Sequence, residues 1–277
     1  MRRVLFLGQK QFGEAAWARL RQGEGDGFRV AAVCSNRAAE KFWWQSNRIF
    51  ETRGSVPFID NEERNEEALL ESIERYEVDT ILCVQHPWVL TQKVLQAVGY
   101  RALNFHNAKL PDYRGYNAIN HAILNGDAQF TCTAHWMADE VDKGDIAFEA
   151  TFDIERTETA LSLYAKCHHA GLQLFERVIS SLGAIEELPR FPLSGRGRFY
   201  SRRSIDTLRE IKFSTAEESE IKSRAFFFPP FEPAYFSARG RRLYVLPEQL
   251  RELGFRAHSV EGLHEMIEAV SCQVTLV

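Results

Sequence analysis

The amino-acid sequence predicts an α/β fold with a largely parallel sheet and helices on both faces. Short apolar runs alternate with amphipathic stretches over roughly residues 1–185, and this alternation is typical of strand–helix–strand units. The first run, residues 3–8 (RVLFLG), is apolar enough for a buried strand. Residues 12–22 (FGEAAWARLRQ) follow at helical spacing, with Phe12, Ala16 and Leu20 on one side.

The remaining elements follow in chain order. Glycines within residues 23–27 end the first helix, and residues 61–76 form an exposed helix with Leu69 and Ile73 turned inward. Residues 130–138 alternate Thr131, Thr133 and His135 against apolar neighbours, as a strand with two unlike faces does. The predicted strands are residues 3–8, 28–36, 78–85, 101–106 and 130–138, and the predicted helices are residues 12–22, 61–76, 91–98, 117–126 and 157–183.

The sequence changes character after about Pro189. Residues 187–204 are loop-like, and residues 224–246 are rich in aromatic residues and proline. Within them the segment SARGRR can turn a β-hairpin between Tyr235 and Tyr244. We therefore predict a main domain of residues 1–189 and a small C-terminal region of residues 190–277 that contains an aromatic-rich hairpin.

Composition limits the possible functions. A formal net charge of −4 over 277 residues argues against bulk nucleic-acid binding. No apolar run approaches the roughly 20 residues that span a bilayer, and the N-terminus does not resemble a signal peptide, so we expect a cytoplasmic protein with no membrane partner. The cysteines contain no CxxC pair, which indicates buried thiols rather than a zinc site or disulfides. They are Cys34, Cys83, Cys132, Cys167 and Cys272.

The histidines do not predict a metal site. His168 and His169 are adjacent in a helix and point to different faces, and neither His121 nor His135 has ligand spacing with them. We expect these histidines to be hydrogen-bonded inside the fold or exposed.

Asn104 and His106 end the predicted strand 101–106 and lie on the same face of it. Ligands of open α/β sheets bind at the carboxyl ends of strands. A neutral histidine can take a proton, and an amide can donate a hydrogen bond to a developing oxyanion, so this pair suits attack on a carbonyl. A carboxylate to orient the imidazole is expected from the segment ADEVDKGDI, among Asp139, Glu140, Asp142 and Asp145, and spacing does not choose among the four.

The motifs LNFHNAKLPDYRGYNAINHAILNGD and TCTAHWMADEVDKGDI resemble the hallmark of formyltransferases that use N10-formyltetrahydrofolate. That hallmark is Asn-x-His, then Leu-Pro-x-Tyr-Arg-Gly, then Asp-x-Gly-Asp. The resemblance implies a formyltransferase-type, Rossmann-like fold over roughly residues 1–185 and a catalytic triad of Asn104, His106 and Asp142. Lys143 replaces the usual small residue before Gly144, a change that touches no triad position.

The resemblance also implies binding residues. The pterin is expected beside CVQHPWVL, with Pro87, Trp88, Leu90, Asp139 and Asp142 as the cofactor-binding residues; the alternative is that Trp88 and Leu90 only pack in the core. The substrate is expected at Arg114, Tyr116 and Asn117, because a guanidinium suits phosphate oxygens, unless Arg114 only braces its own turn. Phe228 and Tyr235 are expected to stack a base; alternatively they form the core of the small region or a dimer contact.

Within the family, the sequence is most similar to sugar N-formyltransferases. This implies formyl transfer to a nucleotide-linked amino-deoxy sugar, a dTDP-3-amino- or dTDP-4-amino-dideoxyhexose, for O-antigen or other surface glycan biosynthesis. From the residues themselves we expect no metal and no nucleic-acid partner, and the aromatic hairpin near the end of the chain favours a homodimer. The alternatives are a methionyl-tRNA formyltransferase, which would carry a basic C-terminal region, and a non-catalytic binder of nucleotide sugars.

Overall fold

The computed structural model describes residues 1–25, 27–38, 47–61, 64–184, 187–212 and 215–252. These residues form two units. The first contains Met1–Arg114, Thr131–Thr151 and His168–Arg198, and the second contains Gly115–Phe130, Phe152–Cys167 and the described part of Phe199–Val277. Two internal segments thus group with the C-terminal residues. The division into a main domain of residues 1–189 and a C-terminal region of residues 190–277 stays a prediction.

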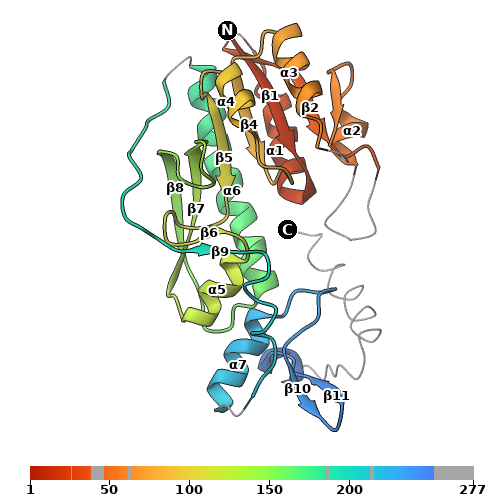
Figure 1. The fold of residues 1–277 in the computed structure, drawn as a ribbon, viewed down its shortest axis with the longest axis vertical. Helices are drawn as coiled ribbons and strands as arrows, with labels where there is room; N and C mark the ends of the chain where they lie inside the picture. The colour runs from red at the N-terminus through yellow and green to blue at the C-terminus, as the bar shows by residue number, and fades with distance from the viewer. Residues whose placement is uncertain (26, 39–46, 62–63, 185–186, 213–214, 253–277) are drawn as a thin grey trace. The chain divides into compact units, whose positions relative to one another are not determined.

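The first unit is built on a seven-stranded sheet in the order β3-β2-β1-β4-β5-β7-β8 (Figure 1). Neighbouring strands from β3 to β5 are parallel, whereas β7 runs antiparallel to β5. The predicted, largely parallel sheet is thereby confirmed. Its strands are β1 (Arg2–Gly8), β2 (Phe28–Ser35), β3 (Phe58–Asp60), β4 (Thr80–Val84), β5 (Ala102–His106), β7 (Gln129–Trp136) and β8 (Ile146–Asp153).

Helices cover both faces of this sheet, as predicted. Alternation along β1 sends Leu5 and Leu7 into a buried cluster with α3 and α4 (Figure 1). Phe6 points to the opposite face, where its ring lies 5.7 Å from that of Trp17 in α1 and 6.1 Å from that of Phe175 in α6. The helices are α1 (Lys10–Gln22), α2 (Arg48–Thr52), α3 (Glu66–Arg75), α4 (Gln92–Ala97) and α6 (Ala160–Gly183), the last of which begins in the second unit.

The second unit contains the predicted hairpin. Its strands β10 (Tyr235–Ala238) and β11 (Arg241–Tyr244) pair antiparallel, with Tyr235 opposite Tyr244. A capping box between Thr215 and Glu218 begins helix α7. The other elements here are α5 (Ala118–Asn125), α7 (Ala216–Ala225) and α8 (Glu248–Glu252), and the short strands β6 (Arg114–Gly115) and β9 (Phe199–Tyr200) pair with each other.

Two strands of the seven-stranded sheet, β3 and β8, were not predicted, and helix α3 begins five residues later than predicted. β3 is three residues long, and β8 is half-exposed along most of its length, so neither gives an uninterrupted apolar run. Helix α3 begins at Glu66 rather than at residue 61 because the side chain of Asn65 accepts a hydrogen bond from the backbone of Ala68 and caps the helix.

The predicted buried thiols are confirmed for four of the five cysteines. Cys34, Cys83, Cys132 and Cys167 are buried and form no disulfide bond among the described residues, whereas Cys272 lies outside the described residues. Burial raises the pKa of the Cys83 thiol to about 12, so this thiol stays protonated at neutral pH.

Candidate functional site

Asn104 and His106 lie at the carboxyl end of β5, as predicted, and both side chains are partly buried. The antiparallel partner β7 places His135 directly opposite Asn104 and Thr133 opposite His106. This register brings a second histidine to the predicted site, because facing residues of paired strands have neighbouring side chains.

The Asn104 amide contacts the His135 ring, with 3.1 Å between Nδ2 and Nε2. On its other side, His135 Nδ1 lies 3.0 Å from the carbonyl oxygen of Trp136. A carbonyl only accepts hydrogen bonds, so Nδ1 carries a hydrogen. Burial lowers the pKa of His135 to about 4, although the nearby Asp142 carboxylate acts in the opposite direction. His135 is therefore neutral at physiological pH, and its Nε2 accepts from Asn104.

His106 is held by a backbone carbonyl as well. Its Nε2 lies 2.8 Å from the carbonyl oxygen of Tyr113, so Nε2 carries a hydrogen and a neutral His106 has its lone pair on Nδ1. The atom of His106 that can take a proton is thus Nδ1.

Asp142 lies between the two imidazoles. Its carboxylate oxygens are 3.9 Å from His106 Nε2 and 3.6 Å from His135 Nε2, and its side chain is 8% exposed. The backbone of Asp142 has φ +54°, a left-handed conformation that aspartate tolerates better than most residues. Two other carboxylates of the segment are engaged elsewhere: Glu140 pairs with Lys143, and Asp139 accepts hydrogen bonds from Gln92 and Tyr100.

Gly144 allows the Asp142 loop to close against β7. A Cβ at this position would lie 1.7 Å from the Trp136 carbonyl oxygen, so Gly144→Ala is expected to lower the free energy of unfolding by about 3 kcal/mol. Urea unfolding measures the loss. Gly183→Ala is the matched control, because a Cβ there meets no atom within 4 Å. Equal stabilities of the two variants would contradict the close packing of this loop.

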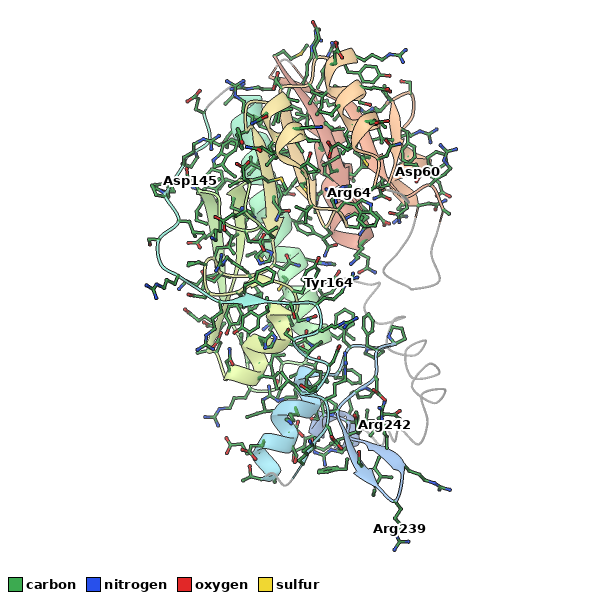
Figure 2. The ribbon with its side chains drawn as sticks, in the orientation of Figure 1. Asp60, Arg64, Asp145, Tyr164, Arg239 and Arg242 are labelled. Atoms are coloured by element: carbon green, nitrogen blue, oxygen red, sulfur yellow. The ribbon has the colours of Figure 1, made fainter. Side chains whose placement is uncertain are left out.

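A pocket beside β2, β3 and β4 contains predicted folate residues. Trp88 and Leu90 line it, together with Asp60 and Arg64, which Figure 2 labels. Leu90 is 7% exposed and belongs to the core, whereas Trp88 is 39% exposed. Trp88 Nε1 donates to the carbonyl oxygen of Asn61.

The same pocket contains buried polar atoms that have no hydrogen-bond partner among the described residues. They are the Asn61 side-chain nitrogen, both ring nitrogens of His86 and the Thr91 hydroxyl oxygen. Burying such atoms unpaired is costly, so they are typical of a pocket that receives a polar ligand or water.

Residues predicted to bind the substrate contact the segment of residues 196–202. The guanidinium of Arg114 donates to the carbonyl oxygen of Arg196 over 3.0 Å. In the second unit, the Asn117 amide donates to the carbonyl oxygen of Arg202 over 3.0 Å, and the Arg202 guanidinium lies 5.6 Å from the ring of Tyr116. Arg114 thus contacts a segment 82 residues away rather than its own turn, and its role in substrate binding stays a prediction.

Phe228 and Tyr235 contact other aromatic residues of the second unit. The Phe228 ring lies 5.1 Å from that of Tyr164, and Tyr235 makes an edge contact with Tyr244 at 6.5 Å. The Arg242 guanidinium lies 4.4 Å from the Tyr235 ring; Tyr164 and Arg242 are labelled in Figure 2. These contacts agree with the packing alternative.

Comparison with known proteins decides the family. Residues 2–179, well over half of the chain, match the family model for formyl transferases. The chain belongs to the formyl transferase family. This confirms the predicted family, and the arrangement of Asn104, His106 and Asp142 lies within the matched residues.

Curated relatives of this family are similar over about two thirds of the chain. A GDP-perosamine N-formyltransferase of Brucella melitensis is 28% identical over 188 residues, which cover 65% of this chain and 69% of the relative. A methionyl-tRNA formyltransferase of Nitratiruptor sp. is also 28% identical, over 66% of this chain and 59% of the relative. Identity alone does not separate the two activities.

Solved formyltransferase structures share the fold. A 4-N formyltransferase from Francisella tularensis has a TM-score of 0.71 and 19% identity, covering 89% of this chain and 97% of its own. An N-formyltransferase from Helicobacter canadensis, solved with folinic acid and dTDP-3-aminofucose, has a TM-score of 0.70 and 20% identity, covering 88% and 86%. The predicted formyltransferase-type fold is confirmed.

The described part of the chain lacks two further features. No group of three or more His, Cys, Asp or Glu side chains is placed to hold a metal ion within the described ranges. Likewise, no helix in the described part of the chain is long and apolar enough to cross a membrane.

Sequence reasoning missed two features of the site. His135 is hydrogen-bonded inside the fold, one of the two situations expected for it, but its contact with Asn104 depends on the register between β5 and β7. Tyr113 contributes a backbone carbonyl, which no side-chain pattern reveals.

Proposed function

We propose that this chain transfers a formyl group from N10-formyltetrahydrofolate to the amino group of a nucleotide-linked amino sugar. The observation that carries the proposal is the meeting of Asn104, His106 and Asp142 at one edge of the sheet, in a chain of the formyl transferase family. Amide, imidazole and carboxylate are the groups that acyl transfer to an amine requires.

N10-formyltetrahydrofolate supplies a formyl carbon that an amine can attack. His106 takes the proton of the attacking amine on Nδ1, since Nε2 is engaged by the Tyr113 carbonyl. The negative charge of Asp142, 3.9 Å away, attracts the positive charge that the ring gains with this proton. Asn104 donates its second Nδ2 hydrogen to the carbonyl oxygen as negative charge develops there. The bond from the formyl carbon to the folate nitrogen then breaks, and His106 returns the proton to that nitrogen.

The pocket of Trp88 and Leu90 fits a flat, polar ring system. Trp88 offers an exposed aromatic side chain, and the unpartnered atoms of Asn61, His86 and Thr91 offer donors and acceptors. Among the predicted folate residues, Trp88 and Leu90 line this pocket, whereas Pro87, Asp139 and Asp142 do not. Asp139 is engaged by Gln92 and Tyr100, and we retain Asp142 because it lies beside His106, where the formyl group has to be placed.

For the acceptor we propose a sugar linked to a nucleoside diphosphate. The Brucella relative acts on GDP-perosamine by its name, and the Helicobacter structure contains dTDP-3-aminofucose, so dTDP-linked and GDP-linked 3-amino and 4-amino sugars are the candidates. In the second unit, Arg202 is held between Tyr116 and Asn117, and its guanidinium suits phosphate oxygens.

The same proposal extends to the biological role, the cellular location and the oligomeric state of the protein. A formylated nucleotide sugar is a precursor for O-antigen or other surface glycans, made in the cytoplasm. A homodimer is proposed to form through the aromatic hairpin region, where Phe231 and Phe236 are exposed in the second unit.

A formyl-transfer assay tests the proposal. Purified protein and N10-formyltetrahydrofolate are offered dTDP-, GDP- and UDP-linked 3-amino and 4-amino sugars and initiator Met-tRNA, with product mass as the readout. We expect one sugar nucleotide to gain the mass of a carbonyl group. Transfer to Met-tRNA alone would establish the tRNA alternative. Binding of a sugar nucleotide without transfer from bound folate would establish the non-catalytic binder.

A further inference from the structure

The His135 side chain joins the proposed oxyanion donor to the backbone of β7. Its Nδ1 donates to the Trp136 carbonyl over 3.0 Å, and its Nε2 lies 3.1 Å from Asn104 Nδ2. His135 is 2% exposed, so water does not compete for either contact.

We propose that His135 is a positioning residue that fixes which end of the Asn104 carboxamide faces the reacting carbonyl. The inference rests on the proposed function, because it assumes that Asn104 stabilises the oxyanion. The amide of an asparagine can turn over, exchanging its NH2 and C=O ends with little change of shape. Without a partner that distinguishes them, either end can face the substrate.

The Trp136 carbonyl determines which ring nitrogen of His135 carries the hydrogen. It holds the hydrogen of His135 on Nδ1, which leaves only a lone pair at Nε2. A lone pair accepts from the Asn104 NH2 group and repels the Asn104 carbonyl oxygen. One Nδ2 hydrogen is therefore committed to His135, and the other remains available for the carbonyl oxygen of the substrate.

The charged groups around His135 do not reverse this assignment. Asp142 Oδ1 lies 3.6 Å from Nε2, beyond hydrogen-bonding distance, and its charge favours protonation of the ring. Burial opposes protonation more strongly, and His106 acts in the same direction as burial. The ring stays neutral, so Nε2 remains an acceptor.

The sequence gives no sign of this role by itself. His135 is on the same face of β7 as Thr131 and Thr133, and it reaches Asn104 only because β5 and β7 pair with Asn104 opposite His135. A shift of one residue in that pairing would send His135 to the other side of the sheet.

Three variants test the role through activity. His135→Phe removes the acceptor and is expected to lower kcat about 10- to 100-fold with little change in KM, since one oxyanion donor is worth roughly 10²–10³ in kcat. His135→Gln keeps an acceptor oxygen and is expected to retain kcat within about fivefold. Thr131→Val is the control, because Thr131 is buried on the same face of β7 but bonds to Thr151.

A double-mutant cycle separates positioning from a merely structural effect. In an Asn104→Ala background, His135→Phe is expected to lower kcat by less than about threefold further, because the group that it positions is gone. Additive losses, or an unchanged kcat in the single His135→Phe variant, would overturn the proposal.

A measurement without turnover distinguishes this proposal from the proposed function. Nitrogen NMR of the labelled wild-type protein at neutral pH is expected to show His135 protonated at Nδ1 and bare at Nε2. The opposite tautomer would overturn the positioning role even in an active enzyme. If the wild type transfers no formyl group to any acceptor while the expected tautomer is found, the proposed function fails and the geometry of His135 stands.

Discussion

His106→Ala is expected to lower kcat for formyl transfer by about 10²–10⁴-fold, the usual contribution of a positioned general base. His106 is the imidazole whose Nδ1 can take a proton, because its Nε2 is engaged by the Tyr113 carbonyl at 2.8 Å. The side chain is only partly buried, so we expect the variant to fold. The rate is measured with saturating folate and acceptor, and circular dichroism checks the fold.

Asp142→Asn is expected to reduce kcat to a similar degree. The substitution removes the negative charge that attracts the positive charge developing on His106 during proton transfer, while asparagine also tolerates the φ of +54° found at this position. Glu140→Gln is the matched control, because Glu140 is exposed in the same loop and pairs with Lys143. Near-wild-type rates in the His106 or Asp142 variant would refute the role assigned to that residue.

The elements that could be predicted from the sequence are those whose burial shows in the local pattern of apolar and polar residues. β1 and β4 are buried on both faces for most of their length and read as uninterrupted apolar runs. β8 is exposed at every second position from Glu149 onward and half-exposed at most of the others, and its sequence follows directly on an acidic loop. β8 is recognisable as a strand only through its pairing with β7, and the sequence does not show which strands pair.

The site could be predicted only in part for the same reason. Alternation placed Asn104 and His106 on one face of β5, but spacing left four carboxylates open, and resemblance selected Asp142. Contacts between residues that are distant in the sequence could not be predicted. The 82-residue separation of Arg114 and Arg196 is an example, since no periodicity links a guanidinium to a carbonyl so far along the chain.

The fold is expected to lose stability steeply as the pH falls from about 7.5 to about 5. Burial lowers the pKa of His86, His135 and His168 from 6.5 to about 4. Because these folded-state values lie below the unfolded value, the unfolded chain binds more protons throughout the interval. The stability of neutral, buried imidazoles is fully present above about pH 6.5 and is lost as the pH falls towards 4.

The expected loss at pH 5 is about 2 kcal/mol for each histidine, a large part of the roughly 5–15 kcal/mol that stabilises an ordinary domain. Urea unfolding at several pH values measures it. His86→Leu is expected to be nearly neutral at about pH 7.5, because both ring nitrogens lack a hydrogen-bond partner among the described residues, and to remove about one third of the loss. His169→Gln, at an exposed position, should leave the loss unchanged. If His86→Leu loses as much stability as the wild type between the two pH values, His86 is not the neutral, buried imidazole that the structure shows.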